Sequence, residues 1–328
     1  MYNKHWVIKM SASKCYVIDT KLTKSFDQKY IEDMEKKLIS ENAKLSQFYR
    51  IFNGSERRRV VRDRASFSLK LKKNMFGLYL VKVMVNHYPA MFLVDTGAQI
   101  TTITDRCAKA FQTRKLEGSI PMEGFSGKRE ESSLVMVDRF DLGDLHITHQ
   151  PMAVCDSSNI NLYLFSINLI GIDGILGWDI LSTLDFEIDD ANLQLNILSS
   201  TIDAPFKNLI STTFPTLILQ GRKQETLIAG FDSGAHHSWI SKKLAQRYEL
   251  SGAAEMMVLG VHGLEKMSTN FAKELRVKLA KTYFVFENVM IGRCDIFENV
   301  EFDCVLGNEI IRKRKIRFLN SRGFVQVL

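Results

Sequence analysis

The feature of this sequence that most constrains its fold is an internal repeat. Each copy has two apolar runs joined by a turn, then an Asp-Thr/Ser-Gly-Ala tetrapeptide, a third apolar run and a short helical stretch. The tetrapeptides occupy residues 95–98 and 232–235, so their aspartates are 137 residues apart. A single Asp-Thr/Ser-Gly triplet is weak evidence, but two in matching contexts predict a duplicated β domain.

The correspondence continues downstream of each tetrapeptide. A Gly-x-x-Gly segment follows the first aspartate by 29 residues and the second by 28. An Asp-x-apolar-Leu-Gly element begins at Asp173 in the first copy and at Asp303 in the second, and a predicted closing hairpin follows each. We therefore predict a mainly β fold with lobes at residues 76–200 and 201–328.

Residues 1–75 lie outside the repeat and are strongly basic. They contain 18 Lys and Arg against 8 Asp and Glu, whereas the whole chain has a formal charge of +7. Apolar residues recur near a helical period from Phe26 to Phe52, with Ser25 and Gln28 as a predicted capping box. We predict an N-terminal extension made of one long amphipathic helix and a linker, whose role the sequence leaves open.

The densest basic run, from Arg57 to Arg64, lies in that linker. Such a run suits contact with nucleic acid, an acidic protein or a membrane surface, but a solvated, exposed linker is the favoured interpretation. The chain has no interleaved aromatic residues there and no recognisable nucleic-acid-binding module.

Several other classes are disfavoured by the sequence. No apolar run approaches the roughly 18 residues that span a bilayer, and residues 1–20 do not form a secretory signal. Five widely spaced cysteines without a Cys-x-x-Cys motif indicate free thiols, hence a cytoplasmic protein. No metal-ligand pattern, phosphate-binding loop or dinucleotide-binding glycine motif is present, so we expect no metal and no cofactor.

The repeated tetrapeptides suggest a specific chemistry. An internal two-fold axis would bring Asp95 and Asp232 face to face. Two carboxylates about 3 Å apart at an effective dielectric of about 20 repel by roughly 5 kcal/mol, so such a pair holds one shared proton. A singly protonated pair can activate water and protonate a carbonyl oxygen. Two ordinary turn aspartates are the alternative.

On these motifs the chain resembles a retropepsin- or pepsin-like aspartic protease, with two retropepsin-like β-barrel lobes in one chain. The resemblance covers residues 76–328 and implies that Asp95 and Asp232 are the catalytic pair. It also implies that the remaining loop residues support them: Thr96, Gly97, Ala98, Ser233, Gly234 and Ala235. The segments Ile175-Leu176-Gly177 and Val305-Leu306-Gly307 match the element that braces each loop.

In that family a hairpin flap covers the substrate. The resemblance places the flaps at Gly124, Phe125, Ser126 and Gly127 and at Gly260, Val261, His262 and Gly263. It implies an aspartic endopeptidase that cleaves an extended polypeptide, with one chain sufficient for a complete active site. The alternatives are a peptide- or protein-binding module that does not cleave, and a regulatory protease docked on nucleic acid.

Overall fold

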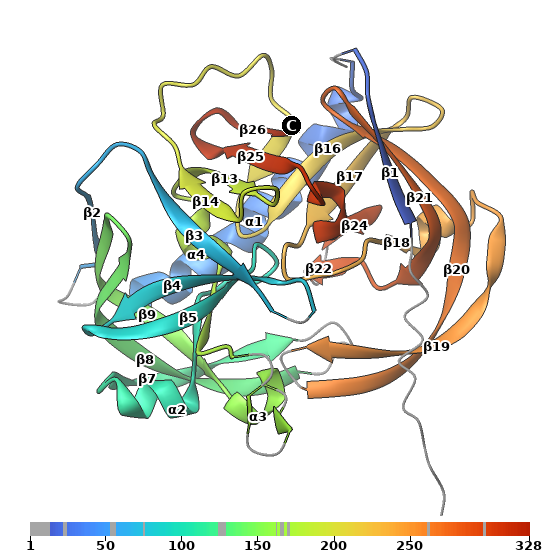
Figure 1. The fold of residues 1–328 in the computed structure, drawn as a ribbon. Helices are drawn as coiled ribbons and strands as arrows, with labels where there is room; N and C mark the ends of the chain where they lie inside the picture. Colours follow the sequence, from blue (N-terminus) through green and yellow to red (C-terminus); the bar gives the residue numbers. More distant parts are fainter. Residues whose placement is uncertain are drawn as a thin grey trace, which may run out of the picture.

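The structure, a computed structural model, is mainly β, as the sequence predicts. It describes residues 14–21, 25–52, 57–74, 76–123, 129–161, 163–164, 167–168, 171–260, 263–297 and 300–328. Most strands of these residues belong to two large sheets (Figure 1).

The larger sheet consists mainly of the first copy of the repeat and ends in strands of the second. Its strands, in sheet order, are β26 (Phe324–Val327), β25 (Lys315–Leu319), β13 (Asp185–Asp189), β14 (Gln194–Ile197), β3 (Phe67–Lys73), β4 (Tyr79–Val85), β5 (Tyr88–Val94), β12 (Gly174–Leu176), β6 (Thr102–Thr104), β9 (Leu145–Cys155), β8 (Arg129–Leu142) and β7 (Arg114–Glu123), with β2 (Arg59–Arg62) beside β9.

The second sheet consists mainly of the second copy. Its strands, in sheet order, are β1 (Lys14–Asp19), β21 (Thr282–Gly292), β18 (Trp239–Ser241), β24 (Cys304–Leu306), β17 (Thr226–Phe231), β16 (Pro215–Gly221), β20 (Gly263–Leu279) and β19 (Leu250–Gly260), with β15 (Leu209–Ser211) beside β16. The remaining elements are α1 (Gln28–Phe52), α2 (Asp105–Ala110), α3 (Ser157–Ile160), α4 (Trp178–Leu181), α5 (Lys242–Ala245), η1 (Asn308–Ile311), η2 (Asn320–Arg322) and two small hairpins, β10–β11 (Tyr163–Leu164, Ile167–Asn168) and β22–β23 (Asp295–Phe297, Val300–Glu301).

The same strand pairings occur in both copies of the sequence repeat. Strand β12 runs parallel to β5 and antiparallel to β6, while β24 runs parallel to β17 and antiparallel to β18. These short central strands have no exposed residues, because their side chains are packed on both faces. Each copy therefore places its tetrapeptide directly after a strand held on a rigid framework.

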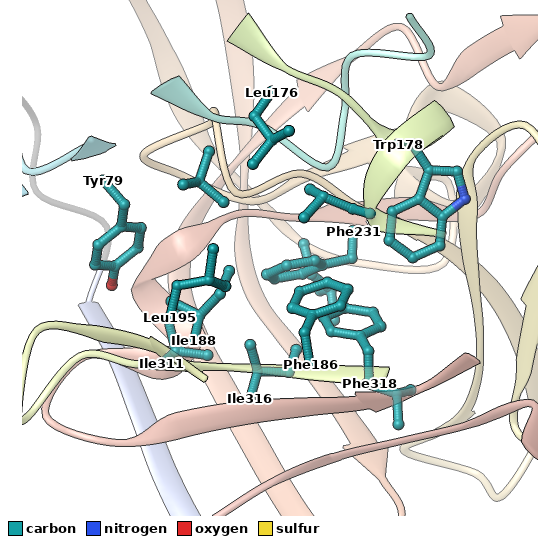
Figure 2. Packing of buried hydrophobic residues seen from close by; sticks show 14 of the residues in the cluster. Tyr79, Leu176, Trp178, Phe186, Ile188, Leu195, Phe231, Ile311, Ile316 and Phe318 are labelled. Atoms are coloured by element: carbon teal, nitrogen blue, oxygen red, sulfur yellow. The ribbon is translucent and has the colours of Figure 1, made fainter. Parts of the chain in front are cut away.

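The closing hairpins of the two copies join across the molecule. Strand β13 pairs antiparallel with β25, with Asp185 opposite Leu319 and Ile188 opposite Ile316. Figure 2 shows the aromatic core beside this junction, where the rings of Phe186 and Phe318 stack with centroids 4.9 Å apart. Because Phe186 belongs to the first copy and Phe318 to the second, one core spans both.

The predicted N-terminal helix is present as α1, which lies on the far side of the sheets in Figure 1. Its first turn is capped by Asp27 and not by the predicted Ser25, since the Asp27 carboxylate accepts a 3.2 Å bond from the Tyr30 N–H. The side chains of Ile31, Met34 and Leu38 are buried in a cluster with residues of β16, β17 and β23. The apolar stripe therefore packs on the second copy of the repeat.

The predicted linker needs a correction, because the basic segment after α1 contains strands. Strand β2 pairs with β9, and β3 pairs with both β14 and β4. Three arginines of the basic run also bond to the framework: Arg58 to Gln150, Arg62 to Leu198 and Arg64 to Asp144. The segment is thus part of the folded molecule rather than a solvated connection.

Candidate active site

The two predicted aspartates lie at equivalent places in the fold. Asp95 follows β5, and its N–H donates to the carbonyl of Leu176 at 3.1 Å. Asp232 follows β17, and its N–H donates to the carbonyl of Leu306 at 2.9 Å. Each aspartate is thereby held by the central parallel strand of its own copy.

The carboxyl groups of Asp95 and Asp232 face each other where the two loops meet, and each carboxyl group lies against the glycine of the opposite loop. The glycines of the two loops permit this approach. A Cβ atom on Gly97 would lie 2.5 Å from Cγ of Asp232, and one on Gly234 would lie 2.5 Å from Cγ of Asp95. Any side chain at either glycine would therefore displace the opposite carboxyl group.

Backbone donors orient each carboxyl group within its loop. Oδ1 of Asp95 accepts from the N–H groups of Gly97 at 2.8 Å and Ala98 at 3.2 Å. Oδ1 of Asp232 accepts in the same way from Gly234 at 2.8 Å and Ala235 at 3.0 Å. One oxygen of each carboxyl group is thus fixed by the loop.

Thr96 and Ser233 hold the loops together by reciprocal bonds. The Thr96 hydroxyl donates to the carbonyl of Phe231 at 2.9 Å and accepts from the Ser233 N–H at 3.0 Å. The Ser233 hydroxyl donates to the carbonyl of Val94 at 2.8 Å and accepts from the Thr96 N–H at 3.0 Å. Both hydroxyls are fully buried, so these four bonds fix the spacing of the loops.

The electrostatics of the pair follow from its burial. Burial raises the pKa of Asp95 above its usual value, although the hydrogen bond from Asp232 opposes the increase. Burial, repulsion by Asp95 and the shared hydrogen bond raise the pKa of Asp232 well above its usual range. The two groups therefore hold a proton together at a pH where a solvated aspartate is ionised.

The apolar-apolar-Gly segments pack directly behind the loops. The Trp178 N–H donates to the carbonyl of Ala98 at 2.7 Å, and the Asn308 N–H donates to the carbonyl of Ala235 at 2.8 Å. A Cβ atom on Gly177 would lie 2.7 Å from the backbone of Ile100, so this glycine is required for the close packing.

Two further acids support the loops and were not singled out in the sequence. Oδ1 of Asp179 accepts from the N–H and hydroxyl of Thr101 at 2.8 and 2.7 Å, and Oε1 of Glu309 accepts from the Ser238 N–H at 2.6 Å. Burial raises the pKa of Glu309 to about 7. The signal available in the sequence was an acid two residues after the glycine in both copies.

His236 and His237 follow the second loop directly. Burial, aided by the charges of Arg312 and Lys73, lowers the pKa of His236. Burial, aided by His236 and Arg312, lowers the pKa of His237 to about 4. Both rings are therefore neutral at neutral pH.

The predicted flaps are described only in part. Six of their residues lie outside the described part of the chain: Gly124, Phe125, Ser126, Gly127, Val261 and His262. Gly260 and Gly263 pair at the ends of β19 and β20. At the end of β7, Glu123 accepts a 2.7 Å bond from Arg293 of the second copy. In Figure 1, β7 and β8 lie at the lower left, and β19 and β20 come in from the right.

Within the described residues, no group of three or more His, Cys, Asp and Glu side chains could hold a metal ion. The same residues include no helix with the length and apolar character needed to cross a membrane. All five cysteines are free thiols.

Two carboxyl groups that face each other on a mainly β framework are typical of aspartic proteases. A protein-family model described as aspartyl protease matches residues 81–180 of this chain, and this match supports an aspartyl protease family. The matched segment contains Asp95 and its brace, whereas Asp232 lies beyond it. No curated protein matches the chain.

Proposed function

We propose that this protein is an aspartic endopeptidase in which Asp95 and Asp232 are the catalytic pair. The observation that carries the proposal is the close approach of their carboxyl groups across two reciprocally bonded loops, at a spacing that only glycines at 97 and 234 permit. Both carboxyl groups come from one chain, so a monomer is sufficient for a complete site.

The proposed reaction uses water as the nucleophile. The ionised carboxylate removes a proton from a bound water as its oxygen bonds to the scissile carbonyl carbon, and the protonated carboxyl group gives its proton to the carbonyl oxygen. The carboxyl group that took the proton from water then gives it to the nitrogen as the C–N bond of the tetrahedral intermediate breaks. The products are one carboxylic acid and one amine, with no covalent enzyme intermediate.

The same proposal extends to the architecture. The two copies would be pseudo-symmetric, retropepsin-like lobes at residues 76–200 and 201–328, with residues 1–75 as an N-terminal extension. The equivalent strand pairings and the reciprocal bonds of Thr96 and Ser233 support this arrangement. The hairpins β7–β8 and β19–β20 would be the flaps that cover an extended polypeptide, which binds through strand-like main-chain bonds.

Cleavage of a diverse peptide library tests the proposal. Asp95→Asn and Asp232→Asn should each reduce turnover by about 10³-fold, since each removes one acid–base group. Asp203→Asn, at an exposed position between β14 and β15, is the matched control and should retain full turnover. Equal turnover in all four proteins would refute the proposal, whereas peptide binding without turnover at any pH would identify a binding module instead.

Localisation and partners follow as smaller proposals. Five free cysteines, four of them buried, suit a reducing compartment such as the cytoplasm. Nucleic-acid contact through the basic segment stays a prediction, which the salt dependence of binding would test. Fewer positive charges of this segment are available to bind nucleic acid, because Arg58, Arg62 and Arg64 already bond within the protein.

A further inference from the structure

A row of hydrogen-bonded side chains links the N-terminal segment to the interior of the first copy. Nε of Arg58 donates to Oε1 of Gln150 at 2.7 Å, and Nε2 of Gln150 donates to Oδ2 of Asp179 at 3.0 Å. The other oxygen of Asp179 accepts from the N–H and the hydroxyl of Thr101 at 2.8 and 2.7 Å. Strand β2 pairs with β9, which places Arg58 next to the part of β9 that carries Gln150.

The direction of the Gln150 amide is determined by the groups around it. A guanidinium group only donates, so Arg58 requires the amide oxygen. Oδ2 of Asp179 and the carbonyl of Pro151 accept from the amide nitrogen at 3.0 and 2.9 Å. The bond from Arg58 is charge-assisted, and Gln150 itself is completely buried.

The row ends at the Asp95 loop. The Thr101 hydroxyl, besides donating to Asp179, accepts from the Gly177 N–H at 3.1 Å. The next residue, Trp178, donates to the carbonyl of Ala98 inside the loop at 2.7 Å. A shift of Thr101 would consequently move the brace that positions the loop.

Among the described residues, the second copy has no equivalent row of hydrogen-bonded side chains. Glu309 occupies the place of Asp179 and accepts from Ser238. Its Oε2 is buried and has no hydrogen-bond partner among the described residues. The amide and the guanidinium are thus additions to the first copy, and the guanidinium comes from outside the repeat.

We propose that Arg58 is a positioning residue for the Asp95 loop, acting through Gln150 and Asp179, so that the N-terminal segment forms part of the active-site support. This inference rests on the proposed function for its effect on catalysis. Its effect on the loop itself is independent of that function. Without Arg58, the Gln150 amide oxygen loses its charged donor, which weakens the hold on the amide whose nitrogen bonds to Asp179 and to the Pro151 carbonyl.

The test compares Arg58→Ala, Arg58→Lys and Arg64→Ala. Arg64 lies in the same segment and bonds to Asp144 at the surface, so its variant is the matched control. Arg58→Ala should lower kcat on a cleaved peptide by about ten-fold with KM within two-fold, because misplacement of a reacting group by a fraction of an ångström acts on kcat. Arg58→Lys, which keeps a donor, should recover part of the loss, and Arg64→Ala should match the wild type.

Amide hydrogen exchange provides a readout that needs no activity. In Arg58→Ala, exchange across residues 96–104 should accelerate at least ten-fold, while the equivalent residues 233–241 of the second copy should be unchanged. Equal kcat and equal exchange in Arg58→Ala and Arg64→Ala would overturn the inference. If the wild type cleaves no peptide, the proposed function fails, and the exchange comparison alone decides whether Arg58 positions the loop.

Discussion

Replacing Glu309 with Gln should change how the stability of this protein depends on pH. Glu309 is buried beside the second aspartate loop, where one oxygen accepts from Ser238 and the other has no hydrogen-bond partner among the described residues. Burial raises its pKa from 4.5 to about 7. Glutamine keeps an oxygen for the Ser238 N–H but cannot ionise, so the variant removes the charge and little else.

The sign follows from the direction of the pKa change. Because the pKa of Glu309 is higher in the folded state than in the unfolded state, its stabilising contribution is complete below pH 4.5 and is lost as the pH rises to about 7. A pKa change of one corresponds to about 1.4 kcal/mol, so the increase of about 2.5 corresponds to about 3 kcal/mol. The wild type and Glu309→Gln should be equally stable near pH 4, and the variant should be more stable by about 3 kcal/mol at pH 8.

Urea unfolding followed by circular dichroism at pH 4, 6, 7 and 8 measures this difference. The contributions of the aspartate pair and of His237 cancel, because both proteins contain them. Glu117→Gln, at an exposed position on β7, is the matched control and should differ from the wild type by the same amount at every pH. A free-energy difference between wild type and Glu309→Gln that does not change with pH would refute the reasoning.

Two further predictions concern the aspartate loops and the N-terminal helix. Gly234→Ala should abolish peptide cleavage, because the added Cβ would lie 2.5 Å from Cγ of Asp95. In the same assay Asp203→Asn, at an exposed position, should stay active, and an active Gly234→Ala would contradict the close approach of the carboxyl groups. Tyr30→Phe should lower the free energy of unfolding by about 1 kcal/mol, because it removes the 2.9 Å bond to Asp303. If α1 unfolded in Tyr30→Phe without any change in the free energy of unfolding of the rest of the protein, the Tyr30–Asp303 bond would not couple the helix to the second copy.

The tetrapeptide loops and their central strands could be predicted from the sequence, because their signals are local. An apolar strand followed by Asp-Thr/Ser-Gly specifies a tight turn within a few residues. Duplication then adds a second, independent instance of the same pattern at 232–235. The mainly β fold, the closing hairpins and the N-terminal helix follow from signals of this kind.

The strands β1, β2 and β3, which flank the N-terminal helix, could not be predicted in this way. A strand such as β2, whose residues are all at least partly exposed, gives no strong alternation, and its assignment depends on pairing with β9 more than 80 residues away. The cap of α1 depends equally on context, since the Asp27 N–H donates to Thr226 of the second copy while its carboxylate caps the helix. Both features are determined by contacts that the segment makes only after folding.

The sequence by itself determined that two aspartates would occupy equivalent turns, because a repeat carries the same local instructions twice. Only the tertiary structure decided which buried groups support those turns. Asp179 accepts from the Gln150 amide, which in turn accepts from Arg58, while one oxygen of Glu309 has no hydrogen-bond partner among the described residues and burial raises its pKa to about 7, although the two acids occupy matching positions. The physical reason is that the ionisation and orientation of a buried carboxyl group depend on the donors that surround it, and those donors come from distant parts of the chain.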